Sequence, residues 1–192
     1  MRINADFSER FVLRPKDMTW VASPSNGVER IMLDRLGGEV ARATSLVRFA
    51  PGSYFPEHAH EGGEEFLVLD GVFSDEHGDF GPGSYLRNPR GTAHTPYTKE
   101  GVTILVKLWQ FQEGDDAEVK INTANSPFSP GLVDGLSVLP LHSHGYESTA
   151  LVRWQPGTRF NRHGHMGGEE IYVIDGTFQD EHGDYPKGTW IR

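Results

Sequence analysis

The chain has 192 residues, 36% of them hydrophobic and 23% charged, and a formal net charge of −9. This length allows two small domains that each bury a core, while the acidic balance disfavours a nucleic-acid partner. There is no cysteine, no apolar run of the roughly 20 residues that a membrane span needs and no signal peptide at the start, so we expect a cytoplasmic protein without disulfides or thiolate metal sites.

Short strands separated by tight turns are predicted along the whole chain, which makes the expected fold class all-β. Residues 1–30 are expected to form an N-terminal arm or extra strands laid on a first barrel, residues 31–112, with Phe11 and Trp20 as anchors. Residues 113–130 are polar and rich in turn-forming residues, so they are interpreted as the connection to a second barrel, residues 131–192. The clearest strand signals are β-branched and aromatic runs at Ser45–Phe49, Phe66–Leu69 and Val102–Trp109.

An internal repeat relates the two predicted barrels. Residues 44–87 align with residues 149–192 at a constant offset of 105 without a gap, and 24 of the 44 pairs are identical. A repeat of this length is a whole domain rather than a solenoid unit. The first copy continues for roughly 25 residues beyond Arg87, whereas the chain ends at the counterpart, Arg192. The second barrel is therefore expected to be incomplete at its C-terminal end in this sequence.

A metal site is predicted in the first barrel, with His58, His60, Glu64 and His94 as ligands. Alternation along a strand points His58 and His60 to the same face, and a bend at the two intervening glycines brings Glu64 back towards them. Its neighbour Glu65 should face the opposite way. A lone buried histidine is more often a hydrogen-bonded core residue, but the repeat keeps both histidines and the glutamate, and buried polar groups are costly without partners.

The second copy reproduces three of these ligands, and its fourth ligand would lie beyond the end of the chain. The three are His163, His165 and Glu169. This second site is expected to be weaker or incomplete.

Other histidines and arginines have simpler interpretations. His77 and its counterpart His182 lie in polar hairpin turns. His142 and His144 are interpreted as loop residues, with an adventitious surface metal site as the alternative. Arg48 and its counterpart Arg153 are interpreted as outward-facing strand residues paired with carboxylates, against the alternative of a clamp for a substrate carboxylate. An apolar lining for a small organic ligand, or a plain core, is predicted from five residues: Phe55, Phe66, Tyr85, Leu105 and Trp109.

The motif spacing resembles that of the cupins, whose fold is a double-stranded β-helix or jelly roll. Gly52, His58-X-His60, Glu64 and Gly71 resemble the first cupin motif, and Gly83, Pro89-X-Gly91 and His94 resemble the second. The stretches Gly-Glu-Glu-Phe, Val-Phe-Ser-Asp-Glu and Arg-Asn-Pro are more narrowly similar to the cupin domain of ChrR-type anti-sigma factors. The resemblance implies a tandem bicupin that binds zinc through the four ligands of the first barrel.

Those anti-sigma factors also carry a helical, sigma-binding domain with a His/Cys zinc site, which has no match in this sequence, so binding of a sigma factor is not expected. The cofactor expected in the first barrel is one divalent metal, with zinc first and Fe, Mn or Ni as alternatives.

Three functions agree with these residues. The first is a sensor or small-molecule-binding protein with a structural metal, because four protein ligands close a tetrahedral zinc site. The second is a metal-dependent dioxygenase acting on a small organic substrate such as a diketone, because the same ligands hold six-coordinate Fe, Mn or Ni with two open positions. The third is a structural domain that forms homo-oligomers through its barrel edges. The sequence names no catalytic residue, and neither membrane nor nucleic acid is an expected partner.

Overall fold

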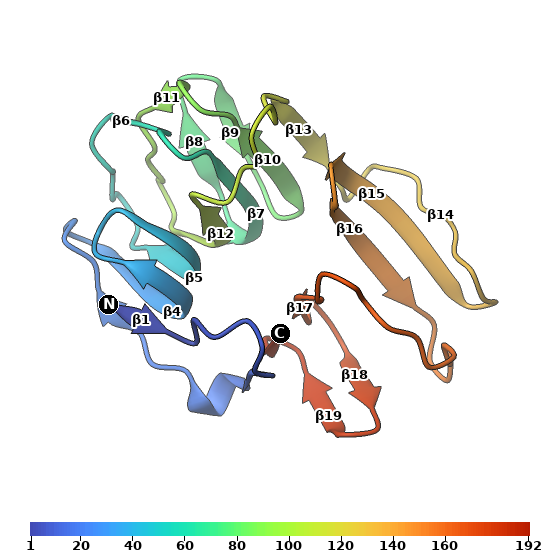
Figure 1. Ribbon diagram of the computed structural model, residues 1–192. Coiled ribbons are helices and arrows are strands. Elements are labelled where there is room, and N and C mark those ends of the chain that lie inside the picture. The colour runs from blue at the N-terminus through green and yellow to red at the C-terminus, as the bar shows by residue number, and fades with distance from the viewer.

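The computed structural model describes residues 1–192 and contains strands with one short 3-10 helix, η1 (Pro15–Asp17). No helix of the structure is long and apolar enough to cross a membrane. The all-β fold class predicted from the sequence is confirmed, and no helix lies anywhere in residues 40–192. The strands form two units, the first in the upper part of Figure 1 and the second to the right and below.

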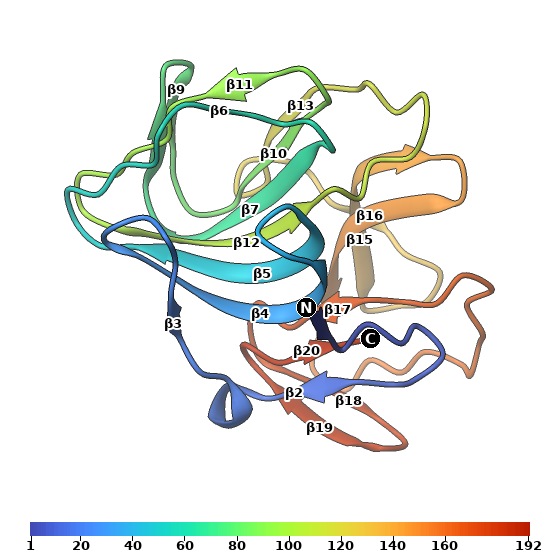
Figure 2. The ribbon, with the colours of Figure 1, turned by 60° about the vertical axis from the view of Figure 1, so that its left-hand side comes forward.

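The first unit is built on an eight-stranded sheet. Its order is β1-β4-β5-β12-β7-β10-β13, with β3 pairing at the outer side of β4. The strands are β1 (Arg2–Ile3), β3 (Val21–Ala22), β4 (Val28–Gly37), β5 (Ala41–Phe49), β7 (Glu64–Gly71), β10 (Ser84–Asn88), β12 (Val102–Leu108) and β13 (Val119–Asn122). Two smaller pairs face this sheet: β6 (His58–Ala59) with β11 (Ala93–His94), and the hairpin β8 (Phe73–Asp75) with β9 (Gly78–Phe80). Figure 2 shows β6 and β11 arching over the strands of the large sheet.

The second unit consists of three small sheets. The orders are β14-β15-β16, β17-β20-β2 and β18-β19. The strands are β14 (Ser129–Pro130), β15 (Leu136–His144), β16 (Glu147–Trp154), β17 (Ile171–Tyr172), β18 (Thr177–Asp180), β19 (Gly183–Pro186), β20 (Trp190–Ile191) and, from the N-terminal segment, β2 (Val12–Leu13). Strand pairing is continuous around neither unit, so the predicted barrels are open jelly-roll sheets rather than closed cylinders.

The N-terminal segment contributes to both units, not only to the first as the sequence led us to expect. β1 and β3 pair with β4, whereas β2 pairs with β20 near the C-terminus. The segment 113–130, expected as a connection, also supplies β13 to the first sheet and β14 to the second unit. The two termini lie close together in Figure 2.

Strand alternation separates two faces of the large sheet. The inward face carries the largest apolar core, which includes Phe66 and Val68 of β7 and Ile104 and Val106 of β12. The opposite face is also buried, because the second unit packs on it: Leu67 lies in one cluster with Leu139 and Leu141 of β15. Tyr85 and Leu105 belong to apolar clusters of this opposite face, which agrees with the plain-core alternative and not with an interior ligand lining. Hydrophobicity alone could not distinguish the faces, since both are apolar.

Candidate metal centre

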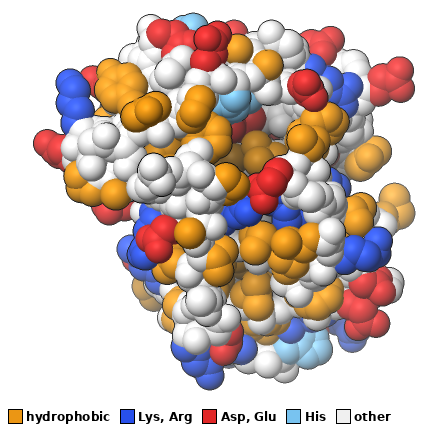
Figure 3. All heavy atoms as spheres, turned by 90° about the vertical axis from the view of Figure 1, so that its left-hand side faces the viewer, with side chains coloured by type: hydrophobic (Ala, Val, Ile, Leu, Met, Phe, Trp, Pro, Cys, Tyr) orange, Lys and Arg blue, Asp and Glu red, His pale blue; other side chains and the backbone are white.

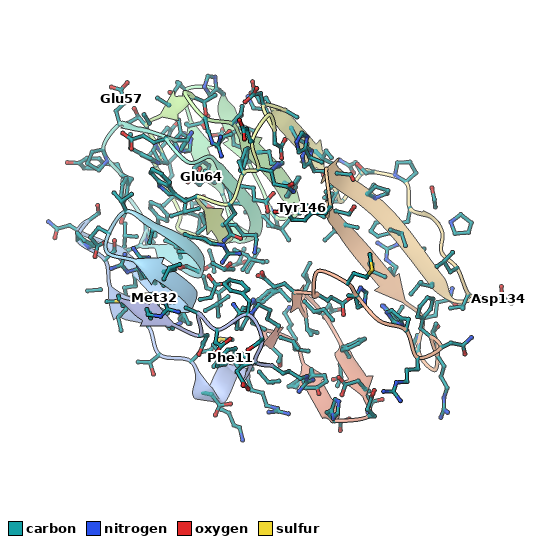
Figure 4. All side chains as sticks on the ribbon, viewed as in Figure 1. Phe11, Met32, Glu57, Glu64, Asp134 and Tyr146 are labelled. Carbon is teal, nitrogen blue, oxygen red and sulfur yellow. The ribbon has the colours of Figure 1, made fainter.

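The four predicted ligands lie in or directly after three strands at one end of the first unit. β6 and β11 run antiparallel, with His94 directly opposite His58. His60 follows β6, and its backbone N–H donates to the carbonyl of Thr92 at 2.8 Å. Glu64 is the first residue of β7. Figure 4 shows Glu64 directed into the interior of the first unit.

The two glycines before Glu64 make the bend that the sequence predicted. Gly63 has φ +79°, a conformation that side chains other than glycine rarely adopt. A Cβ atom at Gly62 would collide with the ring of Trp109. Trp109 therefore covers the backbone of the bend and is 42% exposed, so it belongs neither to a ligand lining nor to the buried core, the two alternatives given by the sequence.

The ligand atoms of His58, His60, Glu64 and His94 all lie within 4.8 Å of one another. His60 Nε2 and His94 Nε2 are each 3.5 Å from the same carboxylate atom, Oε1 of Glu64. Ligands held at about 2.0–2.1 Å around a tetrahedral ion lie about 3.3–3.4 Å apart, so this spacing suits a bound metal ion.

Hydrogen bonds fix the orientation of all three histidine rings through Nδ1. The acceptors at Nδ1 are the Pro56 carbonyl for His58 at 3.1 Å, the Thr92 hydroxyl for His60 at 2.8 Å and the Asp75 carboxylate for His94 at 3.2 Å. With Nδ1 carrying the hydrogen, the lone pair of each neutral ring is on Nε2. Such partners commonly orient metal-binding histidines.

The buried ends of two rings lack any partner within the protein. Nε2 of His60 and Nε2 of His94 are fully buried and make no hydrogen bond. A buried polar atom left unpaired is costly, and a divalent cation between these atoms and Glu64 would satisfy both. The donor set of three imidazoles and a carboxylate suits zinc, iron, manganese or nickel. The residues present therefore fit a metal ion.

The environment shifts the pKa values of the two buried histidines, His60 and His94, in opposite directions. Burial lowers the pKa of His60, because a charged ring is poorly solvated there. Burial opposes protonation of His94 as well, but the hydrogen bond to Asp75 and the charge of Glu64 outweigh it and raise its pKa. Asp75 is also buried, yet hydrogen bonds from His94 and from the backbone N–H of His77 hold its pKa below the usual value.

Three residues of this site were not recognised from the sequence. Thr92 and Asp75 hold the histidine rings, and the Asn88 side chain donates to Glu64 Oε1 at 3.2 Å. Asn88 and Thr92 flank Pro89-Arg90-Gly91 and Asp75 begins a hairpin turn, so each lay within a segment interpreted only as turn chemistry. Glu65, as predicted, faces away from the site; it accepts a hydrogen bond from Tyr85 and pairs with Arg87.

The second set of predicted ligands is arranged differently. His163, His165 and Glu169 are exposed. His165 Nε2 lies 3.4 Å from Glu169 Oε2, and the rings of His163 and His165 are 4.7 Å apart. These three do not form a compact group. The potential ligands that the structure brings together are those of the first unit.

The remaining histidines and arginines fall outside the site's ligand set. His142 and His144 lie in β15 rather than in a loop, and His142 Nε2 is 3.0 Å from the buried carboxylate of Asp115. The sequence missed this because Asp115 belongs to the polar connecting segment. Arg48 forms an ion pair with Glu29 at 2.7 Å, which agrees with the interpretation of an outward-facing strand residue paired with a carboxylate. Arg153 lies over the ring of Phe128.

The all-β jelly-roll fold and the His/Glu cluster together define a cupin with a site that could bind a metal. The family model of the ChrR cupin-like domain matches residues 8–112 and 116–192. The chain belongs to this family.

Relatives differ in how much of each chain they share. The anti-sigma-E factor ChrR of Cereibacter sphaeroides is 34% identical over 120 residues, which are 62% of this chain and 50% of that protein. The match thus spans about half the length of that curated relative. A candidate dioxygenase from Nostoc punctiforme superposes with a TM-score of 0.71 at 13% identity, covering 95% of this chain and 74% of the other. The protein Ylba of E. coli gives 0.63 at 17% identity, covering 95% and 81%. Both likenesses concern the fold.

Proposed function

We propose that this chain is a ChrR-like metal-binding sensor or regulatory protein that holds one zinc ion in its first unit. The observation that carries the proposal is the convergence of Nε2 atoms on Glu64, with every Nδ1 atom tied to an acceptor. His58, His60, Glu64 and His94 would hold the ion. Zinc bound by four protein ligands has a closed tetrahedral shell, which stabilises the fold and leaves no position for substrate.

The interior side of the site supports a structural or sensing metal. Phe55 packs 5.1 Å from the ring of His58, and Phe73 lies 5.6 Å from the ring of His94. Behind them, Phe66 and Leu86 are almost completely buried within the apolar core. The inward face beside the ligands is thus occupied by the protein's own side chains.

The direct test is elemental analysis of the protein purified without added metal. About one zinc ion per chain is expected, falling well below that in His60→Ala. The matched control is His182→Ala, which removes an exposed histidine of a turn in the second unit and should leave the metal content unchanged. Equal metal content in all three proteins would contradict the assignment.

A metal-dependent dioxygenase is the second candidate, and one observation favours it. A polar cavity of about 240 Å³ reaches His60 and His94 from outside, so a small molecule could approach an ion held there. Iron would supply oxygen chemistry if bound with open positions. Oxygen uptake by the iron-loaded protein with a diketone would support this candidate, whereas the sensor proposal expects no uptake above that of His60→Ala.

A further inference from the structure

Two surface depressions flank the ligand group of the first unit. The first is the cavity of about 240 Å³, lined by His60 and His94 and bordered by His77 and Glu118. The second is lined by the residues Glu57, Asp75, Glu76, Thr95 and Tyr97, of which Asp75 accepts a hydrogen bond from His94 Nδ1 and Thr95 follows His94 in the chain.

The rim of both depressions is acidic. Glu57 and Glu76 are exposed carboxylates of the second depression, and Glu118 is an exposed carboxylate of the first. Glu118 is paired with Lys120 at 2.9 Å, whereas no lysine or arginine is among the residues that line either depression. The backbone N–H of Thr95 donates to Glu76 at 3.0 Å, which holds this carboxylate beside His94. In Figure 3 acidic side chains gather at the upper end of the molecule, where the first unit lies. Figure 4 shows Glu57 at its outer edge.

An independent feature of the first depression is a pair of ring nitrogens without a hydrogen-bond partner. The first depression ends on His60 and His94, whose Nε2 atoms are buried and unpartnered. Those two rings are 5% and 3% exposed. An acidic surface alone would be solvated and without consequence, but here Glu118 borders the cavity that the two histidines line, and Glu57 and Glu76 lie in the neighbouring depression.

We propose that the acidic rim selects by charge: it draws divalent cations towards the ligand atoms and repels anions. A small molecule that enters either depression is therefore neutral or cationic rather than a carboxylate, phosphate or enolate. This inference deepens the proposed function and rests on the metal site. Fields from exposed charges extend over a Debye length of about 8–10 Å at physiological ionic strength, and such fields can change association rates tenfold or more.

The repeat gives an internal contrast. The counterpart of Glu57 at the offset of 105 is Arg162, so the second unit has a cation where the first has a carboxylate. The counterpart of Glu76 is Glu181, an exposed residue of the β18–β19 turn. Of the two rim carboxylates that have a counterpart, Glu76 is therefore retained and Glu57 is replaced by a cation.

The test measures uptake of Co²⁺ by the metal-free full chain in stopped flow. The triple variant Glu57→Gln, Glu76→Gln, Glu118→Gln should take up the ion about 5- to 20-fold more slowly at low ionic strength. The difference should nearly vanish at about 0.5 M salt, where the Debye length is only a few ångströms. The dissociation rate should change little, because the ligands are intact.

A control variant with the same change of net charge separates local from global effects. It carries Asp134→Asn, Asp175→Asn and Glu181→Gln, all exposed and in the second unit. Figure 4 shows Asp134 at the far tip between β14 and β15. This control should take up Co²⁺ within about twofold of the wild-type rate. Equal rates in the rim variant and the control would overturn the inference.

A second measurement examines anions directly. Two chelators are compared, anionic nitrilotriacetate and neutral phenanthroline. The ratio of the Co²⁺ removal rate with nitrilotriacetate to that with phenanthroline should be lower for the wild-type protein than for the rim variant. An unchanged ratio would overturn the inference. A chain that takes up no metal at all would refute the proposed function, whereas uptake without any effect of the rim would refute only the charge selection.

Discussion

Replacing Thr92 by valine should weaken metal binding without touching a ligand. The Thr92 hydroxyl lies 2.7 Å from the Pro89 carbonyl and 2.8 Å from His60 Nδ1. A carbonyl only accepts, so the single hydroxyl hydrogen is donated to Pro89, and the hydroxyl accepts from the N–H of His60. This arrangement keeps the lone pair of His60 on Nε2, where the ion would bind.

The size of the effect follows from the lost hydrogen bond. Valine has nearly the shape of threonine, so packing is preserved, but Nδ1–H of His60 loses its acceptor. An unpaired buried donor costs about 1–3 kcal/mol, and loss of a comparable partner in other metal sites lowers affinity about 10- to 100-fold. We therefore expect the zinc dissociation constant of Thr92→Val to rise about 10- to 50-fold.

Competition against a chromophoric chelator measures this change. Thr92→Ser keeps the hydroxyl and should retain affinity within about threefold, and Thr103→Val removes a hydroxyl from β12 outside the site as a control. If Thr92→Val and Thr92→Ser bind zinc equally well, the hydroxyl does not set the form of His60 and the reasoning is wrong.

Three further predictions concern ligands, protons and the contact between units. His60→Ala should lower both metal content and thermal stability of the metal-loaded protein, measured by elemental analysis and calorimetry; an unchanged melting temperature would count against it. Metal binding should weaken below about pH 6, because bound histidines must be neutral. His94, whose pKa is raised, should protonate before His60, whose pKa is lowered. Metal retained after dialysis with chelator at pH 4.5 would contradict this. Although burial opposes ionisation, Lys107 and Trp190 hold the pKa of Glu170 below its usual value. The contribution of the ionised Glu170 to the free energy of unfolding is therefore present above about pH 4.3 and is lost as the pH falls through the lower pKa of the folded state. Glu170→Gln should accordingly cost about 1–3 kcal/mol of unfolding free energy at pH 7 and less at pH 3.5, and equal losses in urea titrations at both values would contradict it.

The strands were predictable where turns punctuate apolar runs. β12 ends one residue before the predicted boundary at Trp109, and β5 begins at Ala41, four residues before the predicted Ser45. Glycine and proline mark the turns, but nothing in the local sequence marks where pairing with β4 begins. Strand ends depend on partners far along the chain, so these boundaries moved more than the strand centres.

The ligand group was predictable because its spacing recurs, whereas its supporting residues were not. Thr92, Asp75 and Asn88 act through contacts between segments separated by 19 to 32 positions. Such contacts leave no periodic signal in a single sequence. For Tyr85 and Leu105 the sequence left a ligand lining and a plain core open for another reason: the sheet is buried on both faces, so an apolar residue does not reveal which face it belongs to.

The paired glutamates connect the site to the assembly of the two units. Glu64 faces the histidines, while Glu65 on the opposite face bonds Tyr85 and Arg87 where the second unit packs. The repeat divides its pair likewise: Glu169 lies beside His165, and Glu170 bonds Lys107 and Trp190 between the units. Adjacent strand residues point to opposite faces, so a slip of one residue would exchange the two roles. Strand β7 therefore carries both the metal ligand Glu64 and the contact residue Glu65 in one register. Metal binding at Glu64 should accordingly stabilise the contact between the units.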